Sequence, residues 1–302
     1  SNVTDMVQMF RSATSFDENI STWDVSNVTS MSKMFNGAIN FNQDISGWDV
    51  SNIVDFSQMF QSAQNFNQDI SNWDLSSVTK IFGMFMNAWS FNQDISSWDL
   101  SNVTNSLGTK NMFTNAYVFN QDISGWDVSN VTTMQSMFQG AESFNQDISI
   151  WDVSNVTNMT DMFIGTDSLS DLYKCEINAA FSSNDNWPYD WSTSCFQPQD
   201  KAELQTAVDL WVSDNSAALS TYGQINTWDV SQVTNMVDLF KNKTTFNDDI
   251  SNWDVSSVTN MSNMFKGAAS FNGDISSWDV SNVLAMDYMF LDVINFNHDL
   301  SN

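Results

Sequence analysis

Carboxylates recur along this chain at a spacing that could bind cations. One aspartate follows each tryptophan of a repeated Ile-Ser-x-Trp-Asp pentad, so these side chains should form one column on the surface. Like charges stacked at the strand spacing of about 4.8 Å repel by roughly 1 kcal/mol in water. Hydrogen bonds from serine or backbone amides, screening salt, a bound partner or Ca²⁺ would offset this repulsion. This candidate cation- or partner-binding column comprises Asp24, Asp49, Asp74, Asp99, Asp127, Asp152, Asp229, Asp254 and Asp279.

A second polar column is an Asn-x-Asp motif before each repeated isoleucine or leucine. Asn and Asp at a turn bond their own backbone two residues further on, so an inward-facing asparagine ladder that satisfies loop carbonyls is one interpretation. Metal ligation is the other. The motifs are Asn42/Asp44, Asn67/Asp69, Asn92/Asp94, Asn120/Asp122, Asn145/Asp147, Asn247/Asp249, Asn272/Asp274 and Asn297/Asp299.

Two kinds of residue could carry covalent modifications. Cys175 and Cys195 both lie in the one stretch that is not repeat, where a disulfide would close a loop of about 20 residues and stabilise by roughly 3 kcal/mol. Two buried thiols are the alternative. Asn-x-Ser/Thr motifs, which accept N-glycans in eukaryotic secreted proteins, begin at Asn2, Asn19, Asn27, Asn102, Asn130, Asn155, Asn158, Asn242 and Asn260.

Catalysis finds little support in the residue types. His298 is the only histidine, and no phosphate loop, nucleophile elbow or zinc-binding spacing occurs. An active site should break the repeat at one place, whereas the acids recur in every copy. We therefore expect no enzyme. A polysaccharide-active enzyme is the remote alternative, and it would require one deep cleft with an asymmetric acid cluster.

The elements that position these columns follow from the repeat. The pentads at Trp23, Trp48, Trp73 and Trp98 are 25 residues apart, and a fixed period in this range predicts a solenoid of stacked coils. Within one coil, Trp48 and Val50 alternate with a polar residue as in a strand.

The second half of a coil has a different period. Met31, Met34, Phe35 and Ala38 have the i, i+3, i+4, i+7 spacing of a short helix, for which Thr29 would be the N-cap. A strand and a short helix per coil predict an α/β solenoid. We expect a leucine-rich-repeat-like horseshoe, with parallel Ile-x-x-Trp-x-Val strands on the concave face, short helices or 3₁₀ turns on the convex face, and tryptophans inside. An all-β right-handed parallel β-helix is the alternative.

The repeat breaks twice. Three extra residues within 105–110 predict a local bulge, and a longer stretch around residues 167–224 contains both prolines and both cysteines. Helical spacing predicts one helix over Ser170–Phe181, with Ile177, Ala180 and Phe181 on one face, and another over Asp200–Val212. We expect both helices to act as caps, because solenoids need atypical ends. One continuous solenoid with an insertion is the alternative. The predicted domains are a first array (1–166), a capping helix region with the disulfide (167–198), an N-terminal cap helix (199–224) and a second array, truncated or continuing (225–302).

Composition restricts the class of partner. The chain has 302 residues, with 36 acidic against 9 basic residues and a net charge of −27. Such a surface repels nucleic acid and anionic lipid, and it attracts cations and cationic partners. No apolar run is long enough to span a membrane, and no signal peptide is present. The chain begins and ends within a repeat, so we expect it to be a segment of a longer array.

The full repeat resembles a known family. Trp-Asp-Val-Ser-Asn-Val-Thr-x-Met-x-x-Met-Phe-x-x-Ala-x-x-Phe-Asn-Gln-Asp-Ile-Ser is similar to the bacterial surface protein 26-residue repeat, found in Mycoplasma and Listeria lipoproteins and related to BspA-like leucine-rich repeats. The resemblance covers about residues 1–166 and 225–302. It implies a secreted or surface-displayed protein with an adhesive or structural role.

These observations predict an extracellular structural or adhesive repeat protein that displays an acidic face, in cell-surface, matrix or filament assembly. The expected partners are proteins, glycans or other copies of itself, with neither nucleic acid binding nor membrane insertion by this segment. A protein that binds divalent cations (calcium being the candidate cofactor), a mineral or an ice surface is the alternative.

Overall fold

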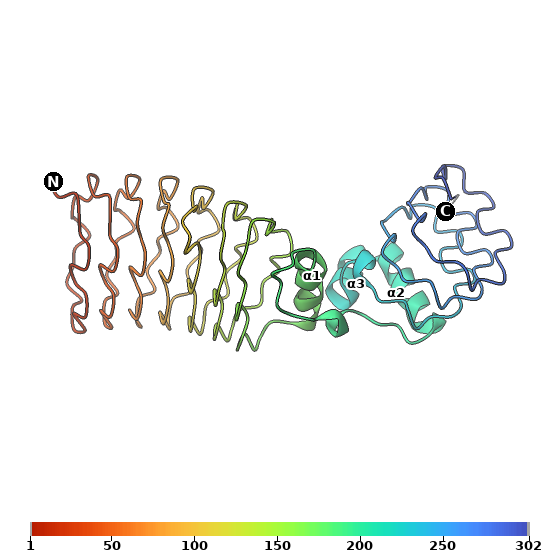
Figure 1. Cartoon of the computed structure of the whole chain (residues 1–302), viewed down its shortest axis with the longest axis horizontal. Helices are drawn as coiled ribbons and strands as arrows, with labels where there is room; N and C mark the ends of the chain where they lie inside the picture. Colours follow the sequence, from red (N-terminus) through yellow and green to blue (C-terminus); the bar gives the residue numbers. More distant parts are fainter. Residues whose placement is uncertain (1, 301–302) are drawn as a thin grey trace. The chain divides into compact units, whose positions relative to one another are not determined.

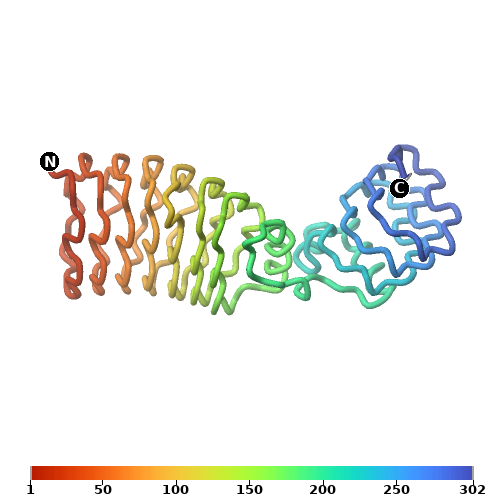
Figure 2. Tube along the Cα trace, viewed as in Figure 1, coloured from red at the N-terminus to blue at the C-terminus, as the bar shows by residue number. Residues whose placement is uncertain are grey.

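The computed structural model describes residues 2–300, and it divides into two compact units. Unit 1 consists of residues 1–173 with 180–189, and unit 2 of residues 174–179 with 190–302. In each unit the repeats run as coils that lie side by side (Figures 1 and 2). Residues 1, 301 and 302, at the limits of the two predicted arrays, lie outside the described residues. The helices are α1 (Asp171–Phe181), η1 (Ser192–Ser194), α2 (Lys201–Ser213), α3 (Asn215–Tyr222) and η2 (Ile225–Thr227).

A ladder of backbone hydrogen bonds joins consecutive coils. The N–H groups of Met31, Lys33 and Phe35 donate to carbonyls 24 residues further on, at 2.9–3.0 Å. Between them, Met34 and Asn36 donate to the carbonyl three residues back, which closes successive turns. We call the stretch corresponding to residues 30–38 of each coil the ladder segment. Apart from Lys80, whose N–H bonds the Val54 carbonyl of the preceding coil, the N–H groups that join coils in this segment point to the following coil and the carbonyls to the preceding one, so the ladder has a direction.

These turns replace the short helix predicted for each coil. Lys33 has φ 58° and Gly37 has φ 74°, in the left-handed region that an α-helix does not contain. A chain of three-residue turns still buries Met31, Met34 and Ala38, so the apolar spacing alone could not distinguish it from a helix. Thr29 is therefore no N-cap, and its hydroxyl donates to the Thr4 carbonyl of the preceding coil at 3.2 Å.

In the part of the chain that the structure describes, backbone pairing between coils does not occur along the Ile-x-x-Trp-x-Val stretches, where parallel strands were predicted. The described residues contain no extended strand but six isolated parallel bridges, among them Asp5 with Ser30 and Ser30 with Asp55, at the start of the ladder segments. The Ile-x-x-Trp-x-Val stretches are joined instead through side chains. Trp48 Nε1 donates to the Ile20 carbonyl at 3.2 Å, and the equivalent bond recurs from coil to coil. The horseshoe and β-helix classes both stay predictions.

Columns of aromatic rings fill the interior of the coils. Phe60 lies 5.8 Å from Phe35 and 5.8 Å from Phe85, with ring planes within 9° of parallel. A second column stacks beside it, with Phe66 only 3.9 Å from Phe60. Most of these rings are fully buried, and Trp48 is 4% exposed. Offset stacking of this kind adds to burial, so each coil depends on its neighbours for its core.

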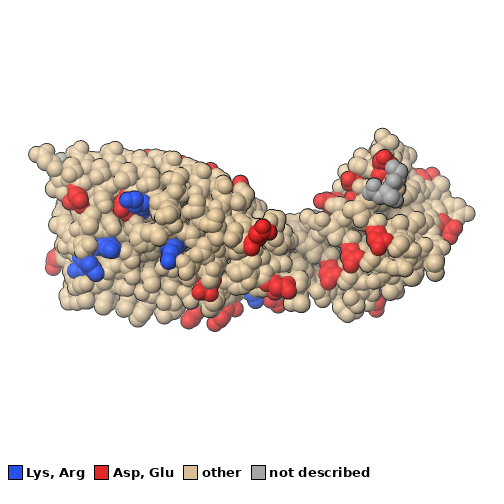
Figure 3. All heavy atoms as spheres, viewed as in Figure 1, with Lys and Arg blue, Asp and Glu red and all other residues tan. Residues whose placement is uncertain are grey.

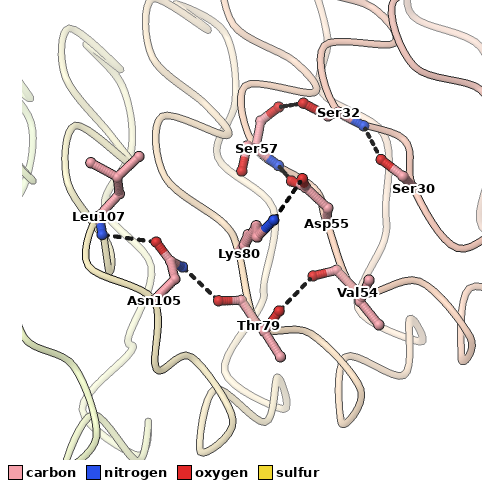
Figure 4. A network of polar contacts seen from close by, with 9 residues as sticks. All are labelled: Ser30, Ser32, Val54, Asp55, Ser57, Thr79, Lys80, Asn105 and Leu107. Atoms are coloured by element: carbon pink, nitrogen blue, oxygen red, sulfur yellow. Dashed lines mark hydrogen bonds and ion pairs between the residues drawn. The ribbon is translucent and has the colours of Figure 1, made fainter.

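The three extra residues form one additional turn at the start of a ladder segment. Asn105 Nδ2 donates to the Thr79 carbonyl of the preceding coil, and the Leu107 N–H bonds Asn105 Oδ1 at 2.8 Å (Figure 4). Gly108 has φ 45°, and a Cβ there would lie 2.6 Å from the Thr133 carbonyl oxygen, so the turn requires glycine. The predicted bulge is confirmed at this position.

A short aromatic segment closes the last coil of unit 1. Trp187 and Tyr189 lie edge-on to Phe163, with ring centroids 6.3 and 6.0 Å away. The Tyr189 hydroxyl accepts from the Phe163 N–H at 2.8 Å. In α1 the predicted face is partly wrong, because Ile177 is buried but Ala180 is exposed.

Helix α2 closes the first coil of unit 2, close to its predicted bounds. Asp200 caps the helix and accepts from two N–H groups of the first turn. The apolar stripe that includes Leu204 and Trp211 packs into the core of the second array, where Trp211 lies edge-on to Trp228 at 5.8 Å. Helix α3 follows directly and was not predicted. It begins at the Asp214 cap, which accepts from the Ala217 N–H.

Candidate functional site

The aspartates that follow the repeated tryptophans all form the same turn. In each of the nine, Oδ1 accepts the N–H of the serine two residues on, at 2.9–3.2 Å. Asp49 and Asp127 also accept the hydroxyl of that serine, at 2.7 and 2.6 Å. Hydrogen bonds of this kind are one of the compensations expected for a ladder of carboxylates. The column therefore has a structural role, and cation or partner binding by it stays a prediction.

The electrostatics of this column show two opposing effects. The hydroxyl and N–H of Ser129 hold the pKa of Asp127 below its ordinary value, while the neighbouring charge of Asp152 raises it. Because the hydrogen bonds prevail, the carboxylate of Asp127 is ionised at neutral pH.

The two residues of the Asn-x-Asp motif make different hydrogen bonds. Asn42 Oδ1 accepts the N–H of Asn67 in the next coil at 2.9 Å, and the same bond recurs along both arrays. The aspartate makes a local turn, as Asp69 Oδ1 does with the Ser71 N–H at 2.9 Å. That N–H and the Ser71 hydroxyl lower the pKa of Asp69 despite repulsion from Asp94 and Asp44. The asparagine ladder exists, but it accepts from backbone N–H groups instead of satisfying carbonyls.

No metal centre is visible in this arrangement. Among residues 2–300 no three His, Cys, Asp or Glu side chains converge as a metal site would require. Within each column, one carboxylate comes from each coil. Serine already engages Oδ1 in all nine aspartates of the first column and in those of the second from Asp44 to Asp274. Calcium binding would therefore have to bridge neighbouring coils, and it stays a prediction.

Several glycosylation motifs lie in structural positions. Nδ2 of Asn102, Asn130 and Asn155 donates to a serine carbonyl of the preceding coil at 2.7–2.8 Å, and this is the nitrogen that a glycan would modify. In a second group, Oδ1 closes a turn two residues on, at Asn19, Asn158 and Asn260. The remaining three, Asn2, Asn27 and Asn242, are exposed. Glycosylation stays a prediction for all nine.

The predicted disulfide is confirmed. Cys175 in α1 bonds Cys195, with the two Cα atoms 4.8 Å apart. Two neighbouring contacts hold the same part of unit 2, since Glu176 Oε1 accepts the Gln224 N–H at 2.6 Å and Asn178 Oδ1 accepts the Trp191 N–H at 3.3 Å. The bond links helix α1 to the segment that leads into the second array.

Basic residues are segregated from the two Asp columns, which sequence reasoning missed. Figure 3 shows basic side chains of unit 1 scattered over a largely uncharged face. The repeat positions of these residues are visible in the sequence, but the segment that they share is defined only by the backbone pairing. Those in ladder segments are Arg11, Lys33, Lys80, Lys110, Lys241, Lys243 and Lys266, seven of the nine in the chain.

Comparison with known proteins identifies a family but no characterised relative. None of the helices in the described part of the chain has the length and hydropathy needed to span a bilayer. No curated protein and no solved structure is significantly similar to the chain. A family model described as "Mycoplasma protein of unknown function, DUF285" matches residues 1–95, 83–187 and 211–302. These matches include both arrays, so the chain belongs to the DUF285 family of Mycoplasma repeat proteins.

Proposed function

We propose that this chain is an extracellular repeat protein that acts in adhesion or in structural assembly at a cell surface. The observation that carries the proposal is the recurrence of one hydrogen-bonded aspartate turn in nine coils. A function spread over many equal charges suits multivalent binding, in which weak contacts add up to high avidity. The similarity to surface-displayed BspA-like repeats supports the same role.

Two further features support this proposal. The disulfide between Cys175 and Cys195 suits an oxidising compartment outside the cytosol. The net charge of −27 favours partners with basic surfaces and disfavours nucleic acid. Because ladder segments carry most of the basic residues, a second copy offers charges that complement the Asp columns. Basic protein surfaces and other copies of this chain are therefore the proposed partners.

Self-association and cell binding at two ionic strengths test the proposal. We expect the purified chain to sediment as larger species, or to label animal cells in flow cytometry, at about 25 mM salt, and to lose this at about 500 mM, where screening acts within a few ångströms. A variant with Asp→Asn at Asp49, Asp74, Asp99 and Asp127 should bind less. The matched control replaces four acids that lie outside the columns and away from the aromatic pair described below, Glu18, Asp185, Asp214 and Asp292. A monomer that labels no cells at either salt concentration would contradict the proposal.

Divalent-cation binding is the second candidate, and one observation favours it. The charges of Asp44 and Asp94 raise the pKa of Asp69 against its serine hydrogen bonds, so neighbouring coils do repel one another. A bound Ca²⁺ would remove this repulsion and raise the melting temperature. Melting with 2 mM Ca²⁺ and with a chelator, together with calorimetric titration, measures it. Equal midpoints and no heat of binding would exclude a structural ion.

A further inference from the structure

One aromatic pair on the surface breaks the symmetry of the repeat. The residue that follows the repeated small residue at the end of the ladder segment is Ile39, Gln64, Trp89, Tyr117 and Glu142 in successive coils. Trp89 is 41% exposed, Tyr117 is half-buried, and their ring centroids lie 5.8 Å apart at an interplanar angle of 37°. The two rings therefore form one aromatic surface that extends across two coils.

Trp89 differs from the pentad tryptophans of the first array from Trp48 onward. The indole N–H of Trp48, Trp73 and each following pentad tryptophan donates to an isoleucine carbonyl inside the coil. Within residues 2–300, the Trp89 indole N–H has no protein partner. Aromatic side chains that lie together at the surface are enriched at binding sites, and the free indole N–H could donate to a ligand.

The neighbouring coils place polar groups on both sides of the rings. Ser90 donates its N–H to the Gln64 carbonyl at 3.1 Å, and Ser143 donates to the Tyr117 carbonyl at 3.0 Å. These bonds bring Gln64 beside Trp89, and Glu142 beside Tyr117. Glu142 is exposed, and so is Asp167, which follows it in the same column of the next coil. The aromatic surface is thus bordered by carboxylates on its C-terminal side.

We propose that Trp89 and Tyr117 bind the cationic side chain of an arginine from a basic polypeptide. The guanidinium would stack on the two ring faces, where the π-electron quadrupole attracts a cation, and it would pair with the Glu142 carboxylate. In unit 1, the repeat position of Trp89 and Tyr117 is never occupied by lysine or arginine, and the whole chain carries a net charge of −27. A cation is therefore favoured over a neutral ligand. Gln64 would supply an amide at the opposite edge.

Calorimetric titration with two short peptides at 150 mM salt tests this site. One peptide is acetyl-Gly-Arg-Gly-Arg-Gly-amide, and the other has citrulline, which has the shape of arginine but no charge. We expect binding of the arginine peptide to weaken by about 2- to 30-fold in Trp89→Gln and in Tyr117→Gln. Glutamine occupies this repeat position in an earlier coil, at Gln64, so both variants should fold. Glu142→Gln should also weaken binding, whereas Asp94→Asn, a control that removes one charge from the coil of Trp89, should change it by less than about twofold.

Three results would overturn the proposal. The first is an affinity of Trp89→Gln for the arginine peptide within twofold of the unchanged chain. The second is equal binding of the citrulline peptide. The third is Trp89-dependent binding of a neutral hexasaccharide without binding of the arginine peptide, which would make the pair a sugar-binding surface. The site does not depend on the extracellular role, because Trp89→Gln leaves both Asp columns intact and should leave salt-dependent association unchanged.

Discussion

The end of the first array and the start of the second array are closed in chemically opposite ways. The last coil of unit 1 leaves the Phe163 N–H without a following coil, and the Tyr189 hydroxyl accepts from it. The first coil of unit 2 leaves the Leu239 carbonyl without a preceding coil, and Gln205 Nε2 of helix α2 donates to it at 3.0 Å. A ladder that has a direction needs an acceptor at one end and a donor at the other, because buried backbone groups must be paired.

The apolar parts of these two caps differ as well. In unit 1 a loop supplies edge-on rings, and Asn184 Nδ2 anchors it to the Val153 and Val156 carbonyls at 2.7 and 2.9 Å. In unit 2 an amphipathic helix supplies the cover, and a disulfide holds the segment before it. The same coil can thus be closed by a loop or by a helix, provided that its rings are covered and its ladder is paired.

The largest expected effect comes from removing one ring of a stacked column in either unit. Phe138 stacks on Phe113 and Phe163, and Phe265 stacks on Phe240 and Phe290. Phe138→Ala and Phe265→Ala should each cost about 3–5 kcal/mol of unfolding free energy, because a cavity replaces a buried ring. Hydrogen exchange followed by mass spectrometry should show faster exchange only in the unit that carries the change. Equal loss in both units would mean that the arrays unfold as one cooperative body.

Removing the disulfide should destabilise unit 2 and leave the stability of unit 1 unchanged. The double change Cys175→Ser and Cys195→Ser removes a cross-link that closes a loop of about 20 residues, which should lower the stability of unit 2 by roughly 3 kcal/mol. Unit 1 contains neither cysteine, so its melting should stay unchanged. Differential scanning calorimetry with unit-specific hydrogen exchange measures both. Destabilisation of unit 1 by the same amount would contradict this division.

Removing the side-chain hydrogen bond that closes either end of the ladder should lower the unfolding free energy by comparable but smaller amounts. Tyr189→Phe keeps the ring and removes the acceptor of the Phe163 N–H, and Gln205→Met keeps the volume and removes the donor to the Leu239 carbonyl. Each should cost about 1–2 kcal/mol, since a backbone group is left unpaired. Exchange of the Phe163 amide should accelerate in Tyr189→Phe only. If both variants are as stable as the unchanged chain, water pairs the ladder ends and the caps act by apolar cover alone.

Lowering the pH should weaken the aspartate turns, and each turn should lose only a small amount of stabilising free energy. Because serine lowers the pKa of Asp127, its contribution is complete above the unfolded pKa of about 3.9 and is lost as pH falls through the folded pKa. We expect the melting temperature of unit 1 to fall below about pH 4. Asp127→Asn keeps the Oδ1 acceptor, whereas Asp127→Ala loses it and should cost less than about 1 kcal/mol at pH 7. Equal melting of both variants would exclude a structural role for the turn.

Much of the coil could be predicted from single residues, because burial follows type and spacing. The interior positions of Trp48, Phe60 and Met31, the helix α2 with its Asp200 cap, and the cysteine pair all follow from local pattern or from the break in the repeat. The candidate site could be predicted only in part from the sequence. The Asp columns are visible in the sequence, but their serine partners make them turn formers, and the segregation of basic residues onto the ladder segments depends on which segments pair.

The sequence by itself determined the 25-residue period, the apolar positions of each coil and the places where the repeat stops, since these depend on residue type at fixed spacing. Only the tertiary structure decided that turns with left-handed residues such as Lys33 replace the helix, because both conformations bury the same side chains. It also decided which segments form the ladder, and hence its direction and its caps. Trp89 and Tyr117, 28 residues apart, become neighbours only through stacking across the inserted turn.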